Sequence, residues 1–293
     1  MEGNLSVTGG VKQNQQCCLL HRIGELRSFC NTANGWFRVF ESLMLGYDRS
    51  LGRETAPGLT QKTLEFLMYL VLFDIDGTLI SSGGAGGAAL MGSFRDTFAI
   101  RDPRPVKFSG RTDRAIAGDL FQLHGLANNA ENWGRLRDGY LERLPNELGQ
   151  RSGTILPGIE PLLETLTSRA DIAMGLLTGN LPDGARIKLE HFGIYQYFPF
   201  GAYGELHESR DDVARDALQL VQQRLADQTP EPDRIWVIGD TPFDVQCARA
   251  IGCQALAVAT GVHDRDELAL SEPDLLLDDL DNPGPWLQHL GPQ

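Results

Sequence analysis

The sequence predicts an α/β fold, a doubly wound parallel sheet of the Rossmann-like kind that carries an inserted α-helical cap domain. Short apolar runs of strand length recur after residue 68 and alternate with longer stretches of helical spacing. That alternation is typical of parallel sheets, because a crossover between parallel strands usually contains a helix. The alternation is interrupted once, between about residues 85 and 148, by helical patterns with no strand between them. An inserted helical domain explains such a segment better than a loop, since structureless loops of that length are rare in compact domains.

The strands are the most distinctive of the expected elements. A parallel strand covered on both faces appears as an unbroken apolar run. Such runs occur at Tyr69–Phe73 and at residues 171–177, 234–238 and 254–259, and Leu275–Leu277 is predicted to add a short edge strand. The helices expected between the strands span residues 159–169, 184–192, 210–227 and 242–251. Within the insert, helices are expected at residues 88–98, 112–124 and 131–143.

Residues 1–67 differ from the rest of the chain. This segment holds three of the five cysteines, is rich in Asn, Gln and Gly early on, and shows no strand pattern. We expect a poorly ordered extension, with a short helix at residues 36–45 where apolar residues recur at helical spacing. An alternative is that translation starts at Met68, directly before the first strand, and the sequence does not choose between the two. The core is then expected to comprise residues 68–84 and 149–293, and the cap residues 85–148.

Charge and composition argue against several classes of protein. A formal net charge of -13 repels nucleic acid and acidic lipid, so neither is expected as a partner. There is no run of ~20 apolar residues to cross a bilayer and no basic region followed by an apolar block, as in a secretory signal. The cysteines lack paired CxxC spacing, which argues against a zinc site and favours reduced thiols. We therefore expect a cytoplasmic monomer or homodimer, and any anionic substrate would need a local cation at its site.

The strongest motif is FDIDGTL, residues 73–79, which directly follows the first apolar run. Asp74 and Asp76 lie two residues apart, so a continuing strand would place both side chains on one face. They also lie at the carboxyl end of a parallel strand, where α/β folds bind ligands. Clustered carboxylates repel each other and are costly to bury unless a cation joins them. All-oxygen ligands suit a hard cation such as Mg²⁺, and Gly77 then lets the chain turn away.

A second acidic motif, VIGDTPFD, ends another apolar run and opens a helix. Asp240 would project beside Asp74 if the two strands are neighbours, which adds a third carboxylate to the same edge. Asp244 lies within the first turn of the helix, where capping and the helix dipole offer a simple structural explanation.

Two shorter motifs complete the candidate site. Thr178-Gly179-Asn180 follows a third strand, and a hydroxyl beside exposed backbone N–H groups makes a good phosphate cradle, although the same tripeptide is also a common turn. Arg210 stands at a helix start, where a cation is mildly unfavourable for the helix dipole. A functional role for Arg210 is therefore favoured over a structural one.

These motifs, in this order, resemble the haloacid dehalogenase-like hydrolase superfamily over about residues 69–280. The insert lies between the first motif and Thr178, as in the helical-cap branch that contains phosphoglycolate phosphatases and β-phosphoglucomutases. The resemblance implies that Asp74 attacks phosphorus and forms an aspartyl-phosphate. It implies that Asp76 protonates the leaving alcohol and later deprotonates the attacking water. The family's dehalogenases lack the second aspartate, so Asp76 favours phosphate chemistry.

The resemblance also implies a ligand set for Mg²⁺ and for the phosphoryl group. The cation would be held by Asp74, the backbone carbonyl of Asp76 and Asp240, with Asp244 as a closely associated partner. The phosphoryl oxygens would be held by Thr178 and Arg210. We also assign Gly77, Thr78, Gly179 and Asn180 to substrate binding.

One position departs from the family pattern. Phosphatases with this type of cap usually carry a lysine followed by prolines at the third motif, whereas Arg210 has no proline after it. Lys188 is a rival, but it lies ten residues after Thr178 on what is expected to be an exposed helix face. Arg210 fits the strand-then-helix context better and is the preferred cation.

The cap is expected to choose the substrate. Arg111, in a glycine-containing loop between two cap helices, has the forked geometry to clamp a carboxylate, which would suit phosphoglycolate. The alternative is that Thr112 or Asp113 caps the following helix and that the Arg111 side chain is simply solvated. The glycine-rich residues 81–87 are expected to act as a hinge or a plain linker. The leading hypothesis is a hydrolase for a small phosphomonoester, with phosphoglycolate as the leading guess for the substrate. The alternatives are a sugar phosphomutase and a catalytically silent binding module.

Overall fold

The computed structural model describes residues 69–225 and 229–291. The extension expected at residues 1–67, its helix at residues 36–45 and Met68 lie outside the described residues. A six-stranded parallel sheet forms the centre of the described part, in the order β5-β4-β1-β6-β7-β8. The strands are β1 Tyr69–Phe73, β4 Ile172–Thr178, β5 Gly201–Tyr203, β6 Ile235–Gly239, β7 Gln254–Val258 and β8 Leu275–Leu277. This confirms the doubly wound parallel sheet, including the edge strand at β8.

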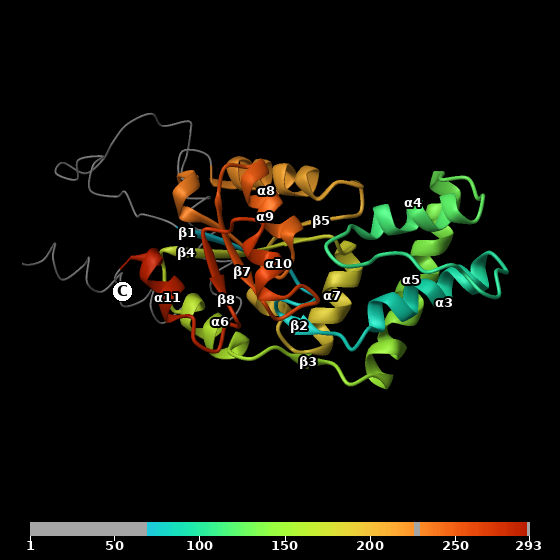
Figure 1. The fold of residues 1–293 in the computed structure, drawn as a ribbon, viewed down its shortest axis with the longest axis horizontal. Helices are drawn as coiled ribbons and strands as arrows, with labels where there is room; N and C mark the ends of the chain where they lie inside the picture. Colours follow the sequence, from blue (N-terminus) through green and yellow to red (C-terminus); the bar gives the residue numbers. More distant parts are fainter. Residues whose placement is uncertain (1–68, 226–228, 292–293) are drawn as a thin grey trace, which may run out of the picture. The chain divides into compact units, whose positions relative to one another are not determined.

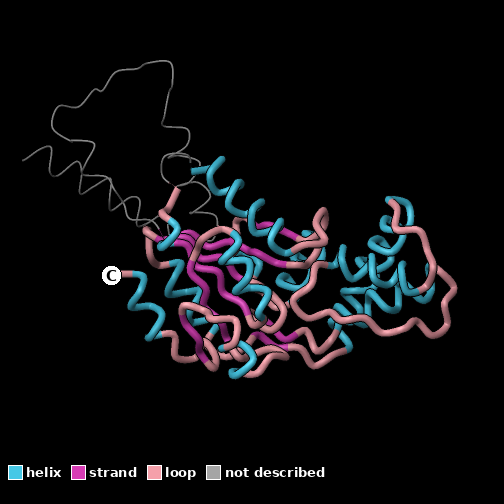
Figure 2. The backbone as a smooth tube through the Cα atoms, turned by 45° about the horizontal axis from the view of Figure 1, so that its top comes forward, coloured by secondary structure: helices cyan, strands magenta, loops and turns pink. Residues whose placement is uncertain are grey.

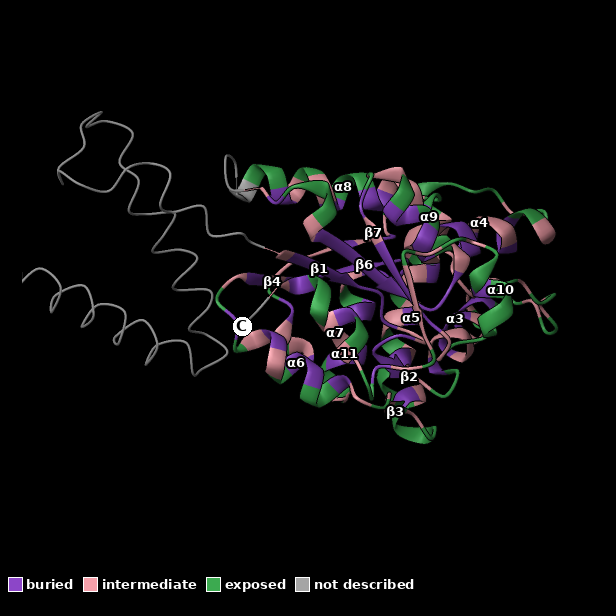
Figure 3. Ribbon diagram, turned by 60° about the vertical axis from the view of Figure 1, so that its left-hand side comes forward, coloured by how far each residue is buried: buried purple, intermediate pink, exposed green. Residues whose placement is uncertain are grey.

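Helices cover both faces of this sheet (Figures 1 and 3). One face carries α8 and α9, and the other carries α6, α7 and α11. Their bounds are α6 Ile159–Thr167, α7 Pro182–His191, α8 Arg210–Leu225, α9 Pro242–Ala250 and α11 Gly284–Leu287. A further short helix, α10 Arg265–Ala269, precedes β8. The central strands are buried, as their unbroken apolar sequences require, and the helices turn polar residues to solvent (Figure 3).

The insert forms three helices that gather beyond one end of the sheet (Figures 1 and 2), as predicted. They are α3 Ala85–Thr97, α4 Asp113–Leu123 and α5 Ala130–Gln150. A short antiparallel ribbon of β2 Ile80–Ser81 and β3 Thr154–Ile155, which the sequence did not predict, joins the two connections to the core. The cap helices have a hydrophobic cluster of their own, centred on residues such as Phe94, Phe121 and Tyr140.

Helix α5 runs further than its sequence suggested. We expected it to stop at residue 143, but it continues past Pro145 to Gln150. Its buried residues Leu136, Tyr140, Leu144 and Leu148 recur every four positions, so burial of one apolar face extends across the proline. Among the described residues, no helix is long and apolar enough to cross a bilayer.

Candidate active site

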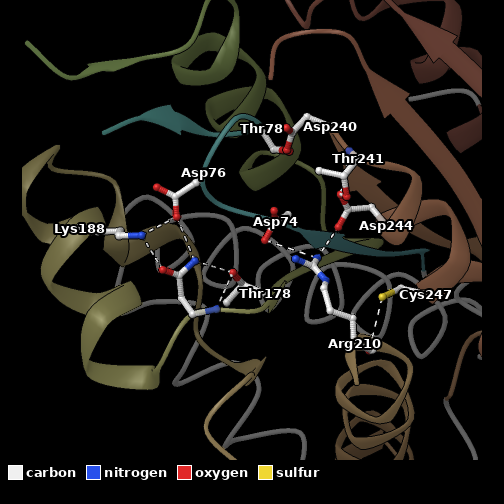
Figure 4. A network of polar contacts seen from close by, with 11 residues as sticks. Asp74, Asp76, Thr78, Thr178, Lys188, Arg210, Asp240, Thr241, Asp244 and Cys247 are labelled. Atoms are coloured by element: carbon white, nitrogen blue, oxygen red, sulfur yellow. Dashed lines mark hydrogen bonds and ion pairs between the residues drawn. The ribbon is translucent and has the colours of Figure 1, made fainter. Parts of the chain in front are cut away.

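Three strand ends bring the predicted site residues together. Strand β1 lies between β4 and β6, with Phe73 paired to Leu176 on one side and to Ile238 on the other. Because all three strands are parallel, the residues that follow them meet at one edge of the sheet. Asp74, Thr178 and Asp240 lie at that edge, and Figure 4 shows their side chains grouped there.

Three carboxylates form a buried acidic cluster within this edge. Oxygens of Asp74, Asp240 and Asp244 all lie within 4.8 Å of one another, and the residues are 5%, 2% and 2% exposed. The Thr78 hydroxyl donates to Oδ1 of Asp240 at 3.1 Å. Gly77 has a φ of 88°, and a Cβ there would overlap the Asp240 carboxylate, so only glycine suits this turn.

Burial and mutual repulsion disturb the acidic cluster strongly. Burial raises the pKa of Asp74 to about 6, with Arg210 opposing the rise and Asp244 adding to it. Burial also raises the pKa of Asp240 well above its usual range, and the Asp244 and Asp74 carboxylates add to that rise. Oδ1 of Asp74 is buried and accepts no hydrogen bond from the described residues. A buried oxygen without a hydrogen bond, among crowded carboxylates, fits a hard divalent cation, which would remove the repulsion and use that oxygen.

Asp244 caps helix α9, which is the structural role that the sequence allowed, and it also pairs with Arg210. Its Oδ2 accepts from the backbone N–H of Thr241 at 3.0 Å and from the Thr241 hydroxyl at 2.7 Å, which caps helix α9. Its Oδ1 pairs with the Arg210 guanidinium. Helix capping therefore holds Asp244 in place while its second oxygen faces the site.

Arg210 is the cation of the acidic cluster. It is 6% exposed at the start of α8, and its Nη2 pairs with Asp244 and lies 3.6 Å from Oδ1 of Asp74. These carboxylates raise its pKa well above the usual range although burial acts in the opposite direction. A permanent positive charge therefore lies next to Asp74, at the position where the sequence predicted a local cation for an anionic substrate.

Lys188 lies on the other side of the site, and its expected exposure was wrong. The residue is only 4% exposed, because it shares the inward face of α7 with Gly184, Ala185 and Leu189. Its Nζ lies 2.5 Å from Oδ2 of Asp76 and 2.5 Å from Oδ1 of Asn180 (Figure 4). The small residues one turn before Lys188 and the leucine after it were the signal that could have identified this inward face.

Asp76 therefore lies in a different environment from Asp74. Besides Lys188, it accepts hydrogen bonds from the Asn180 amide at 3.1 Å and from the Ser82 hydroxyl at 3.0 Å. Burial alone would raise the pKa of Asp76, but the Lys188 charge and these hydrogen bonds outweigh it and lower the pKa. Because 38% of the side chain is exposed, solvent screens part of this effect.

The cap closes onto this edge through the loop before α4. The backbone N–H of Asp113 donates to the Gly179 carbonyl at 2.8 Å, and Oδ2 of Asp113 accepts from the Leu181 N–H at 2.8 Å. A Cβ at Gly179 would overlap the carbonyl oxygen of Arg111, so glycine permits this close approach. The Arg111 side chain pairs with Asp119 at 2.5 Å within the cap, so its proposed contact with substrate would have to replace that pair.

Comparison with known proteins identifies the family. The family model described as haloacid dehalogenase-like hydrolase matches residues 71–258. The chain belongs to the haloacid dehalogenase-like hydrolase family. The phosphoglycolate phosphatase of Synechococcus elongatus is 28% identical over 213 residues, which cover 72% of this chain and 93% of the relative.

Two further similarities extend the family picture. The tyrosine-protein kinase PtkA of Mycobacterium tuberculosis is 30% identical over 198 residues, which cover 66% of this chain and 62% of that protein. A haloacid dehalogenase-like hydrolase from Streptococcus pneumoniae has the same fold, with a TM-score of 0.55, 23% identity, and coverage of 75% of this chain and 99% of the other. The chain is thus similar in sequence to proteins of more than one described activity.

Proposed function

We propose that this protein is a Mg²⁺-dependent phosphomonoester hydrolase that works through an aspartyl-phosphate at Asp74, with phosphoglycolate as its leading substrate. The observation that carries the proposal is the placement of Asp74. It lies buried at a strand end, facing a permanent cation and next to a carboxylate pair that suits a metal. Similarity to phosphoglycolate phosphatases over most of their length supports the choice of substrate.

The metal would be held by the acidic cluster. Asp74, Asp240 and the backbone carbonyl of Asp76 are the proposed ligands, with Asp244 as an associated partner. When bound, Mg²⁺ would supply positive charge that neutralises the phosphoryl oxygens.

The first half-reaction transfers the phosphoryl group to the enzyme. A carboxylate oxygen of Asp74 attacks phosphorus, and the bond from phosphorus to the ester oxygen breaks. Asp76 gives a proton to the leaving alcohol, for which it must be in its protonated form, the minor one at neutral pH because its pKa is lowered. Arg210 and Thr178 hold the phosphoryl oxygens, with the backbone around Gly179. Gly77, Thr78 and Asn180 are the remaining residues that we assign to substrate binding.

The second half-reaction restores the enzyme. Asp76 takes a proton from water as the water oxygen attacks phosphorus, and the bond from phosphorus to Asp74 breaks. Inorganic phosphate leaves, and Asp74 is again a free carboxylate. Its negative charge is balanced by Arg210 at 3.6 Å.

A panel of phosphate esters with and without Mg²⁺ tests this function. We expect hydrolysis that requires Mg²⁺, with phosphoglycolate turned over more efficiently than hexose phosphates or nucleoside monophosphates. Asp74→Asn should lower kcat by at least about 10³-fold, because an amide is a poor nucleophile. Asp183→Asn is a matched control, since Asp183 is 63% exposed on α7 and pairs only with Arg186 among the described residues.

Each part of the proposal has its own contrary result. Turnover that survives Asp74→Asn would remove Asp74 as the nucleophile. Similar efficiency on several esters would reject phosphoglycolate as the preferred substrate and leave the mechanism in place.

A further inference from the structure

Lys188 is a buried cation that the family mechanism proposed above does not use. A lysine that is 4% exposed has lost most of its hydration, which is costly unless anions or dipoles replace the water. Both of its hydrogen-bond partners among the described residues belong to the candidate site, namely Asp76 and Asn180. The side chain therefore connects the interior face of α7 to two polar groups next to the reaction centre.

The hydrogen bonds of Lys188 also fix the orientation of the Asn180 amide. An ammonium group can only donate, so the amide atom that faces it must be the oxygen. The amide nitrogen then points away from Lys188, where it donates to Asp76 at 3.1 Å and to the Thr178 hydroxyl at 2.9 Å. Asp76 Oδ2 is thus held from two directions by groups that Lys188 either supplies or orients.

We propose that Lys188 is a positioning residue, which orients the Asp76 carboxyl group for its exchange of protons with the leaving alcohol and the attacking water. This inference rests on the proposed function, because it acts through Asp76. Arg210 serves the phosphoryl group and the nucleophile, whereas Lys188 serves the proton donor and acceptor. The site then contains two buried cations with separate tasks.

The close packing around the Lys188 ammonium group supports its role as a positioning residue. A Cβ added to Gly86 at the start of α3 would lie 3.1 Å from Nζ, so the cap closes over the ammonium group and limits its movement. The Lys188 charge also lowers the pKa of the cap residue Asp113, although burial still raises that pKa to about 6. The cation therefore lies where core and cap meet, next to the groups that handle the substrate.

The test separates the two half-reactions by choice of leaving group. 2,4-Dinitrophenyl phosphate releases a phenolate that needs no proton, so a poorly placed Asp76 should slow only the attack of water. For Lys188→Met we expect kcat to fall about 10- to 100-fold. This fall is smaller than the whole rate gain that a positioned general acid or base supplies, because Asp76 is still present. The fraction of enzyme carrying a phosphoryl group, measured by intact mass after acid quenching, should rise during turnover. In the background of Asp76→Asn, the same change should have little further effect.

Arg186→Met is the matched control, because Arg186 lies on the same helix and forms only exposed ion pairs with Asp183 and Glu190 among the described residues. It should leave kcat and the phosphorylated fraction at wild-type values. If Lys188→Met does not fold, the pair Lys188→Met with Asp113→Asn is compared with Asp113→Asn alone, since Asp113 is one of the two carboxylates whose charge Lys188 offsets.

Two results would overturn the inference. One is an unchanged kcat, and the other is a lower kcat with no rise in the phosphorylated fraction, which would indicate general damage to the fold. Failure of the proposed function is recognised separately, because the unaltered enzyme would then form no phosphorylated species and hydrolyse no ester.

Discussion

Asp74 and Asp76 are two residues apart on one chain, yet their environments differ in nearly every respect. Asp74 is 5% exposed and has its pKa raised to about 6, because burial and a neighbouring carboxylate outweigh the attraction of Arg210. Asp76 is more exposed and has its pKa lowered, because Lys188 and two hydrogen-bond donors outweigh burial. The same side chain therefore acquires two chemical characters from its neighbours alone.

The difference shows why two cations are present. Arg210 is shared between Asp74 and Asp244, and Asp240 lies beside them with no cation of its own among the described residues. That half of the site is short of positive charge and suits a metal. Lys188 is committed to Asp76 and Asn180, so the other half is already balanced.

Removing Arg210 should have the largest effect, because two buried carboxylates depend on this cation. Arg210→Met leaves Asp74 and Asp244 buried without their cation, and loss of one partner of a buried ion pair costs about 3–5 kcal/mol of stability. We expect that loss in urea unfolding near neutral pH without metal. Arg215→Met on the same helix is the control, because the Arg215 pair with Asp212 is exposed and worth at most about 1 kcal/mol. A loss for Arg210→Met no larger than that of the control would show that the cluster does not depend on this cation.

Neutralising Asp240 should relieve the repulsion in the acidic cluster, because it removes one negative charge from the half of the site that is short of positive charge. The Asn oxygen of Asp240→Asn can still accept from Thr78, while the repulsion with Asp74 and Asp244 falls. We expect the metal-free protein to keep or raise its Tm, and Mg²⁺ binding measured by calorimetry to weaken by at least about tenfold. The exposed Asp278 provides a control in Asp278→Asn, which should change neither quantity. Unchanged Mg²⁺ affinity in Asp240→Asn would place the metal elsewhere.

Much of the fold was accessible from the sequence, because its signals are local and repeated. Unbroken apolar runs marked the central strands, and helical spacing marked the cap. The short strands β2 and β3 were not identified, since two residues carry too little pattern, whereas β5 lies where a strand was expected before Arg210. The end of α5 was also misplaced, because burial of Leu144 and Leu148 outweighs the local effect of Pro145.

The site residues that lie at the ends of strands were predictable from the sequence. Asp74 and Asp240 directly follow strands and Thr178 is the last residue of one, so parallel pairing alone brings them together. Lys188 was not predictable in the same way, because its burial depends on which face of α7 meets the core and on the cap above it. A charged residue on a helix is usually solvated, and only tertiary contacts with Asp76 and Asn180 make the exception.

The smallest expected effect concerns Asp113, where the cap meets the Lys188 side of the site. Burial raises the pKa of Asp113 to about 6, so the folded protein binds this proton more tightly than the unfolded chain does. Folded molecules then hold more protons between the ordinary carboxyl pKa and about pH 6, and the free energy of unfolding falls as the pH rises through that window. Asp113→Asn removes this titration, while its amide oxygen can still accept from the Leu181 N–H.

The stability of Asp113→Asn relative to wild type should therefore rise with pH. In urea unfolding, the free energy of unfolding of the variant should gain on the order of 1–2 kcal/mol over that of wild type between about pH 4 and about pH 7, after allowance for the partial exposure of Asp113. Asp138→Asn, on the exposed face of α5, should show no such trend with pH. A gain for Asp113→Asn that grows as the pH falls would reverse the sign and show that Asp113 is stabilised as a carboxylate by the nearby Lys188.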